Sequence, residues 1–322
     1  MIDIDALRSG NRRALGKAIT LLESTRADHR VSAEQLLESI MPYTGESIRI
    51  GITGVPGVGK SSLIEVLGNY VAGLGKRVAV LTIDPSSSLT GGSILGDKTR
   101  METLSINPSA FIRPSPSQTT LGGVARRTQE AVLVCEAAGF DVIIVETVGV
   151  GQSETLVASM TDVFVLMLLP GSGDELQGIK RGIMELADIA VINKADGELK
   201  GKATRAAADI KHALQLIQPR LAQWRVPVEV TSALENRGID EVWQRICDYS
   251  DTLGKAALLE RRQVQSRQWF WNETRERLLD ELKSSQFVKA DFGSLERQVM
   301  SGELPPSIAA GQLVTKFLEQ KK

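Results

Sequence analysis

Residues 51–62 read GITGVPGVGKSS and fit the phosphate-loop pattern G-x-x-x-x-G-K-[ST] at Gly54, Gly59, Lys60 and Ser61. An apolar run precedes this stretch, and a helix-compatible segment follows it. Glycines let backbone N–H groups close around phosphate oxygens, and the following helix presents the positive end of its dipole to the anion. The stretch therefore predicts a strand, a phosphate-binding loop and a helix, in that order.

Two side chains of this loop are expected to do most of its chemistry. Lys60 is expected to reach the β- and γ-phosphates of a nucleotide, and the Ser61 hydroxyl is expected to help hold Mg²⁺. The residues expected to contact the nucleotide here are Gly54, Gly57, Val58, Gly59, Lys60, Ser61 and Ser62. An ordinary glycine-rich turn is the alternative interpretation, and the strand and helix signals on either side disfavour it.

The composition is that of a globular protein: 322 residues, of which 42% are hydrophobic and 24% are charged. A net charge of -1 gives no reason to expect a nucleic-acid partner. No apolar run is long enough to span a bilayer and the N-terminus has no signal-peptide core, so we expect a cytoplasmic protein without a membrane partner. The two cysteines and two histidines lie far apart in sequence, which disfavours a transition-metal site.

The chain divides into three predicted parts. Residues 1–46 show helical spacing and are expected to form an N-terminal helical arm, with Ser32 and Gln35 as a capping box at a helix start. Residues 47–252 alternate strand-length apolar runs with helical segments. This is typical of an α/β fold with a mostly parallel sheet and helices on both faces. The runs after the first lie at 78–83, 142–145, 163–169, 189–192 and 228–230, with a short one at 111–113.

Residues 253–322 form the third predicted part, a C-terminal helical extension. It contains a long, charged, amphipathic pattern with Trp269, Phe270 and Trp271 inside it. Exposed aromatic residues of this kind mark an interface, and core packing on the main domain is the alternative. We favour a dimerisation arm.

Polar clusters follow the apolar runs, and ligands of open α/β sheets bind outside these carboxyl ends. Asp84 and Asp97 lie in the long polar connection 84–100, where turn formation is the alternative role for each. Glu146 follows the run at 142–145, where nucleotide hydrolases hold Mg²⁺ or its water; a Glu favours contact through water. The Gly149 N–H is placed to sense a γ-phosphate.

Two further clusters follow the next apolar runs. Asp174 and Lys180 lie in 170–182. Asp174 is expected at a helix N-terminus, where the helix dipole favours a carboxylate, and Lys180 could face the phosphates or a neighbouring loop. Solvent-exposed charges near a helix start are the alternative for both. Asn193, Lys194 and Asp196 fit N-K-x-D, in which the Asp carboxylate accepts hydrogen bonds from N1–H and the exocyclic amine of guanine. Adenine offers neither donor in that arrangement, so the pattern predicts a preference for GTP. Further guanine contacts are expected from Ser232, Ala233 and Leu234.

The segments GVPGVGKSS, DPSSSLTGGSILGDKTRM, VETVGVGQSE, GDELQGIKRG and NKAD occur in this order, and together they closely resemble the MeaB/ArgK family. The resemblance covers essentially the full length. It implies a GTPase of the SIMIBI class of phosphate-loop proteins, a homodimeric G-protein chaperone that uses GTP, GDP and Mg²⁺. The implied partner is an adenosylcobalamin-dependent mutase, typically methylmalonyl-CoA mutase, whose cofactor delivery and protection the GTPase gates.

The resemblance also implies roles for individual positions. Lys60 and Ser61 would bind phosphate and Mg²⁺, and Asp84 and Glu146 would belong to the metal environment. Asp97 would lie in a switch-like loop, and Asp174 and Lys180 would lie in a mobile segment that transmits the partner's presence. Asn193, Lys194 and Asp196 would read guanine.

Hydrolysis is expected to be slow without a partner. Many small GTPases place a water-orienting Gln directly after the switch glycine, whereas Val150 follows Gly149 here and Gln152 stands two residues further on. We therefore expect a partner to accelerate hydrolysis by ordering the loops.

Three other functions are alternatives to that of a chaperone GTPase. A nickel-inserting GTPase generally carries Cys and His ligands near the nucleotide, and this chain has no such cluster. A small-molecule kinase of the arginine type needs an acceptor site with a base, for which Asp84 or Asp97 could serve only by default. Intact Lys60, Ser61 and Asp196 disfavour a purely structural protein.

Overall fold

The computed structural model describes residues 2–24, 26–83, 101–114, 121–147, 153–171, 181–217 and 221–319. The chain forms two compact units, Met1–Gln265 and Ser266–Lys322. The first unit contains the sheet and the candidate site, and the second is helical.

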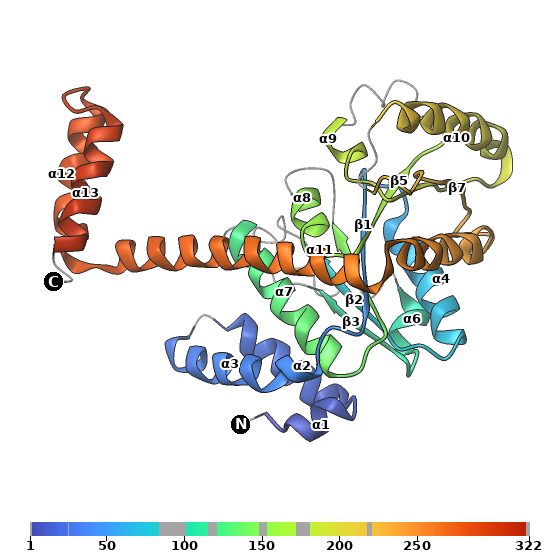
Figure 1. Ribbon diagram of the computed structural model, residues 1–322, viewed down its shortest axis with the longest axis horizontal. Coiled ribbons are helices and arrows are strands. Elements are labelled where there is room, and N and C mark those ends of the chain that lie inside the picture. The colour runs from blue at the N-terminus through green and yellow to red at the C-terminus, as the bar shows by residue number, and fades with distance from the viewer. Residues whose placement is uncertain are drawn as a thin grey trace. The chain divides into compact units, whose positions relative to one another are not determined.

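The first unit is built on a seven-stranded sheet of order β3-β2-β4-β1-β5-β6-β7 in which every neighbouring pair is parallel (Figure 1). Its strands are β1 (Ile48–Gly54), β2 (Val78–Ile83), β3 (Ala110–Pro114), β4 (Val142–Thr147), β5 (Val163–Leu168), β6 (Ile189–Ile192) and β7 (Val228–Val230). The predicted parallel sheet is confirmed. Because β1 lies between β4 and β5, the phosphate loop that follows it is flanked by the segments that leave those strands.

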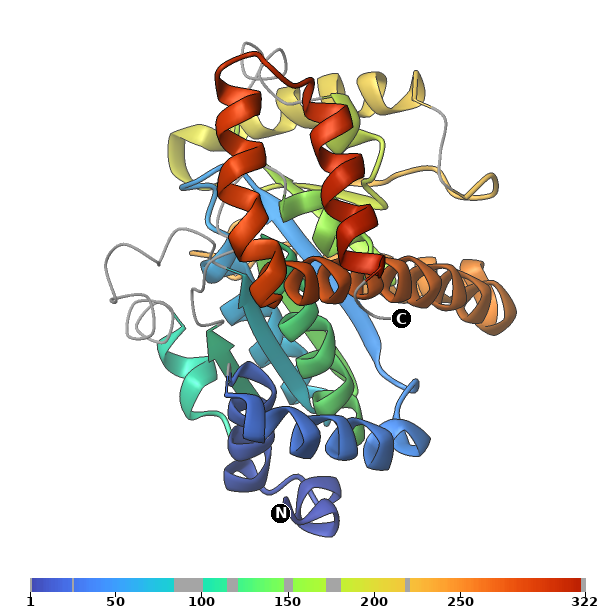
Figure 2. The same ribbon diagram turned by 90° about the vertical axis from the view of Figure 1, so that its left-hand side faces the viewer.

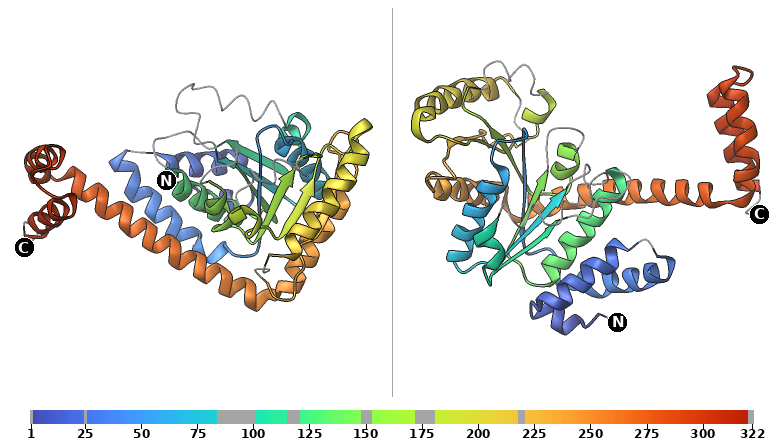
Figure 3. Two further views of the ribbon diagram at one scale, coloured as in Figure 1. Left: turned by 90° about the horizontal axis from the view of Figure 1, so that it is seen from above. Right: turned by 180° about the vertical axis from the view of Figure 1, so that it is seen from behind.

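Helices cover both faces of this sheet, as predicted, and the two layers can be followed in Figures 1 and 3. The elements on one face are α4 (Lys60–Gly73), α6 (Glu102–Ile106) and the beginning of α11 (Ile239–Ser284). The elements on the other face are α7 (Leu121–Ala137), α8 (Ser153–Ala158), α9 (Arg181–Met184) and α10 (Lys200–Gln215), which is preceded by the 3-10 turn η4 (Gly197–Leu199). In β1, Ile50 and Ile52 face α4, and Gly51 lies between them against α8.

The N-terminal segment packs on this second face as three helices and a 3-10 turn, and Figure 2 shows them beside α7. They are α1 (Ile4–Arg8), α2 (Arg12–Glu23), α3 (Ala27–Ile40) and η1 (Met41–Tyr43). The predicted helix start at Ser32 is wrong, because α3 begins six residues earlier and has Arg26 as its N-cap. Burial of Leu36 and Ile40 stabilises α3 through tertiary packing, which overrides a local capping pattern.

Helix α11 is interrupted at Gly254, whose φ of +71° and ψ of 160° are not helical. A positive φ favours glycine, so this position allows the sharp change of direction inside the helix. Residues up to Gln265 belong to the first unit. The division at 252/253 into a G domain and a dimerisation arm remains a prediction.

The second unit contains the end of α11 and two further helices, α12 (Gln286–Met300) and α13 (Pro306–Glu319). Leu295, Ala309 and Phe317 are its buried apolar residues among those described. Phe270 and Trp271 of α11 are 61% and 58% exposed, and their rings meet edge to face. None of the helices in the described ranges is both long enough and apolar enough to cross a membrane.

Candidate functional site

The phosphate loop connects β1 directly to α4, as the sequence predicts. Gly59 is the N-cap of α4 and has a φ of +91°, in the left-handed region that favours glycine. A Cβ on Gly59 would also lie 2.6 Å from Nδ2 of Asn193, so a side chain would not fit without movement. Gly57 has a positive φ as well, whereas Val58 between them is fully buried. Glycine is therefore required here both by backbone conformation and by close packing.

Lys60 and Ser61 open helix α4, and both contact the edge of the sheet. The buried Lys60 amino group donates hydrogen bonds to the carbonyl oxygens of Gly54 and Val55, at 2.8 and 3.3 Å. The Ser61 hydroxyl donates to Oε1 of Glu146 at 3.0 Å, so the structure brings these two predicted metal-site residues together. Ser62 is exposed on the next position of the helix.

Asn193 braces the phosphate loop from the neighbouring strand end. Its Nδ2 donates to the carbonyl of Val58 at 2.9 Å. Its Oδ1 accepts from the Thr231 hydroxyl at 3.2 Å and from the Ala233 N–H at 3.3 Å. Asn193 therefore joins the phosphate loop to the ends of β6 and β7, which holds the N-K-x-D segment at a fixed distance from the loop. Lys194, the next residue, has a positive φ of 61°.

Asp196 is oriented by the segment after β7. Its Oδ2 accepts a hydrogen bond from the Ser232 hydroxyl at 2.8 Å, and that hydroxyl accepts from the Glu235 N–H at 3.0 Å. The side chain of Leu234 is 86% exposed, so any contact it makes with a base would be through its backbone. Asp196, Ser232 and Ala233 thus lie together beyond the carboxyl ends of β6 and β7.

A hydroxyl pair that the sequence analysis missed joins the strand ends below the site. Thr53 and Thr147 are both fully buried, and their Oγ1 atoms lie 2.8 Å apart. Thr53 directly precedes the phosphate loop, and Thr147 directly follows Glu146. A Thr at the tip of each of two neighbouring parallel strands is the sequence signal that could have revealed this pair.

Five predicted site residues lie outside the described ranges: Asp84, Asp97, Gly149, Asp174 and Lys180. Within the described part of the chain, no group of three or more His, Cys, Asp or Glu residues could hold a metal ion. Cys135 and Cys247 are both free, and burial raises the pKa of each thiol, far above its ordinary value for Cys135. Neither thiol is therefore primed for chemistry at neutral pH.

Comparison with known proteins agrees with this geometry. The family model described as methylmalonyl-CoA mutase-associated GTPase MeaB matches residues 15–286. A protein of Caulobacter vibrioides described as a GTPase is 53% identical over 98% of this chain and 98% of its own length. The methylmalonic aciduria type A homolog of Mus musculus, described as mitochondrial, is 44% identical over 97% of this chain and 78% of its own length.

A solved structure similar to this chain is titled a LAO/AO transport system kinase. It has a TM-score of 0.76 and 39% identity, and the match covers 98% of this chain and 96% of that one. The family match spans every described residue of the nucleotide site. The chain therefore belongs to the MeaB family of GTPases, and it binds guanine nucleotide and hydrolyses GTP.

Proposed function

We propose that this GTPase is a G-protein chaperone for an adenosylcobalamin-dependent mutase, methylmalonyl-CoA mutase in the first instance. GTP binding and hydrolysis would gate loading of the cobalamin cofactor and protect the mutase. The observation that carries this proposal is the match to the mutase-associated GTPase family over 15–286, a range that includes the whole sheet. The similarity to the methylmalonic aciduria type A homolog supports it.

The nucleotide site is proposed to work through the residues brought together above. Lys60 would move from the carbonyls of Gly54 and Val55 to the β- and γ-phosphates, and backbone N–H groups of residues 54–62 would surround the phosphate oxygens. Asp196, held by Ser232, would accept the guanine N1–H and amine. Asn193 would keep the base end and the phosphate end in register.

Mg²⁺ fits the donors that the structure places beside the phosphate loop. The Ser61 hydroxyl and the Glu146 carboxylate are hard oxygen ligands, which Mg²⁺ prefers, and they already lie within hydrogen-bond distance of each other. A bound Mg²⁺ would neutralise charge on the phosphates. Roles for Asp84, Asp97, Gly149, Asp174 and Lys180 remain proposals from the family resemblance.

The chain is also proposed to act as a homodimer through its C-terminal helices. Phe270 and Trp271 stand exposed on α11, Phe292 and Met300 on α12, and Ile308 and Leu318 on α13. Apolar surface of this kind is buried in permanent dimers. Sedimentation equilibrium should give twice the mass of one chain, and Trp271→Glu should shift the equilibrium toward the monomer.

The central experiment measures GTP hydrolysis with and without purified methylmalonyl-CoA mutase. We expect slow turnover alone and faster turnover with the mutase, with Lys60→Ala inactive in both conditions as the control. An unchanged rate with every adenosylcobalamin-dependent mutase of the same genome would contradict the chaperone proposal. Because the solved relative is titled a kinase, transfer of labelled γ-phosphate to arginine is measured in parallel. Transfer to arginine would instead favour the kinase.

A further inference from the structure

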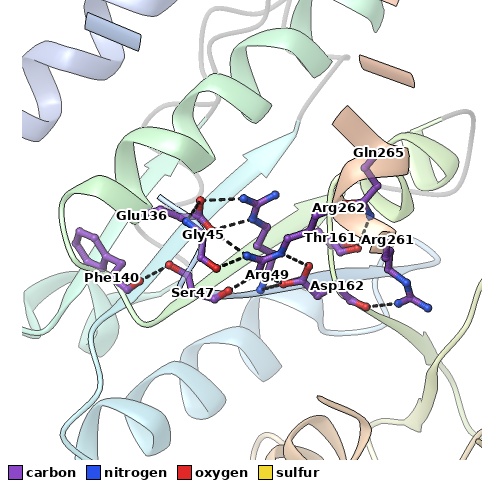
Figure 4. A network of polar contacts seen from close by, with 10 residues as sticks. All are labelled: Gly45, Ser47, Arg49, Glu136, Phe140, Thr161, Asp162, Arg261, Arg262 and Gln265. Atoms are coloured by element: carbon purple, nitrogen blue, oxygen red, sulfur yellow. Dashed lines mark hydrogen bonds and ion pairs between the residues drawn. The ribbon is translucent and has the colours of Figure 1, made fainter. Parts of the chain in front are cut away.

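A buried network of charged residues lies at the amino-terminal edge of the sheet, at the opposite end of β1 from the phosphate loop (Figure 4). Its centre is Arg262 of α11, which is 9% exposed. The Arg262 guanidinium donates two hydrogen bonds to the Asp162 carboxylate, from Nε to Oδ1 at 2.9 Å and from Nη2 to Oδ2 at 2.6 Å. Arg262 also donates to the carbonyl oxygens of Ser47 and Gly45. All three guanidinium nitrogens are therefore engaged.

A second arginine–carboxylate pair completes the network beside Arg262. Arg49 of β1 makes a bidentate contact with Glu136 of α7, at 2.9 and 2.8 Å. The same carboxylate accepts from the Gly45 N–H at 3.1 Å and lies 4.0 Å from Nη1 of Arg262. Segments from all three predicted parts of the chain, around 45, 136–162 and 262, therefore share one set of buried charges.

The network holds one short turn, between α8 and β5, through several hydrogen bonds. Gln265 donates Nε2 to the carbonyl of Thr161 at 2.8 Å, and Arg261 donates Nη1 to the carbonyl of Asp162 at 2.5 Å. Together with Arg262, three side chains of one stretch of α11 are thus attached to two consecutive residues. Asp162 in turn accepts from the Arg49 N–H at 2.9 Å, at the start of β1.

This turn is closely packed against β1. A Cβ on Gly51 would lie 2.6 Å from Cγ1 of Val157 and 2.8 Å from Oγ1 of Thr161, so α8 and the turn touch the strand backbone itself. Gly51 is three residues before Gly54, the first residue of the phosphate loop. The turn therefore lies between the strand that carries the phosphate loop and the stretch of α11 that Arg262 anchors.

Buried charges of this kind do not add stability that apolar packing could not provide. Removing several charges from water costs more than a well-packed apolar contact, and the return depends on complete pairing in one geometry. Such a network instead holds α11 in one defined position on the turn, because packed interfaces move between discrete arrangements and do not deform continuously.

We propose that the Asp162–Arg262 clamp couples the guanine-nucleotide state of the phosphate loop to helix α11, with Arg262 as a positioning residue. A change at β1 and α8 on exchange of GDP for GTP would move Thr161 and Asp162, and the three anchored side chains would move α11 with them. The proposal concerns nucleotide and this chain alone. Its failure would leave the mutase proposal standing, and failure of the mutase proposal would leave this one standing.

The test measures amide hydrogen exchange of residues 255–265 in the full chain, with GDP and with a non-hydrolysable GTP analogue. In the unaltered protein we expect the exchange rates to differ by about tenfold between the two states, within the usual range of coupling between sites. In Arg262→Met the difference should fall below about twofold, while GDP affinity stays within about threefold, because Arg262 does not touch the nucleotide.

The matched control is Arg245→Met, which removes an arginine from the exposed side of the same helix, where Arg245 pairs with Glu229 and Asp248. It should keep the full difference in exchange. If Arg262→Met does not fold, Arg262→Lys is measured, because an ammonium keeps the charge but not the planar set of donors. The proposal is overturned if the unaltered protein shows no difference, or if the folded variant keeps it, as a purely structural Arg262 would.

Discussion

The two ends of strand β1 use polar groups in opposite ways. At the carboxyl end, Lys60 is hydrogen-bonded to carbonyls of its own loop and Ser61 to Glu146, partners that a nucleotide and its metal ion could replace. At the amino end, Asp162 and Arg262 are bonded to each other and to backbone groups that are permanent parts of the fold. Exchangeable partners suit a binding site, and permanent ones suit an anchor.

The largest effect is expected when Asp162, the permanent partner of Arg262 at the amino end, is removed. Asp162→Ala would leave Arg262 and the Arg49 N–H without their carboxylate, and breaking a buried pair costs about 3–5 kcal/mol. Urea unfolding should show this loss in the free energy of unfolding. Asp248→Ala, which removes a partly exposed partner of Arg245, is the control and should cost less than about 1 kcal/mol. Equal losses of unfolding free energy in both variants would show that Asp162 contributes no more to stability than a surface carboxylate does.

The next effect concerns the backbone of the carboxyl end. Gly59→Ala forces a side chain onto a residue with a φ of +91° and into contact with Nδ2 of Asn193. Strain of this kind is worth about 1–3 kcal/mol, so GDP affinity should fall by roughly 10- to 100-fold in calorimetric titration. Gly73→Ala at the other end of α4 meets no neighbouring atom and should bind GDP normally. Normal binding by Gly59→Ala would show that the loop tolerates a side chain.

How far the sequence predicts these two ends differs for a physical reason. Strands buried on both faces of a parallel sheet read as continuous apolar runs, and a phosphate loop has fixed spacing, so β1, Lys60 and Asp196 could be located from sequence. Arg262 and Asp162 are separated by 100 residues, and nothing in their spacing indicates contact. The predicted start of helix α3 is wrong for a related reason, because tertiary burial determines where the helix begins.

A smaller effect is expected where a base partner is held by one hydroxyl. Inosine diphosphate lacks the exocyclic amine of GDP. In Asp196→Ala the ratio of the affinity for GDP to that for inosine diphosphate should fall by about tenfold, which is most of the preference. Ser232→Ala removes the hydrogen bond that orients Asp196 and should lose a smaller part, about threefold. Competition against a fluorescent guanine nucleotide gives both ratios. If the ratio were unchanged in Asp196→Ala, a group other than Asp196 would read the amine.

The carboxyl end also contains one permanent contact, between the hydroxyls of Thr53 and Thr147. Thr53→Val keeps the shape of the side chain but leaves the buried Thr147 hydroxyl without its partner, so the free energy of unfolding should fall by about 1–2 kcal/mol. Thr147→Val should cost a similar amount. The double variant should recover most of the loss, because replacing both partners leaves no polar group unsatisfied. Full additivity in urea unfolding would mean that the two hydroxyls do not depend on each other. Recovered stability with reduced GTP hydrolysis would show that the pair also positions the Glu146 strand end against the phosphate loop.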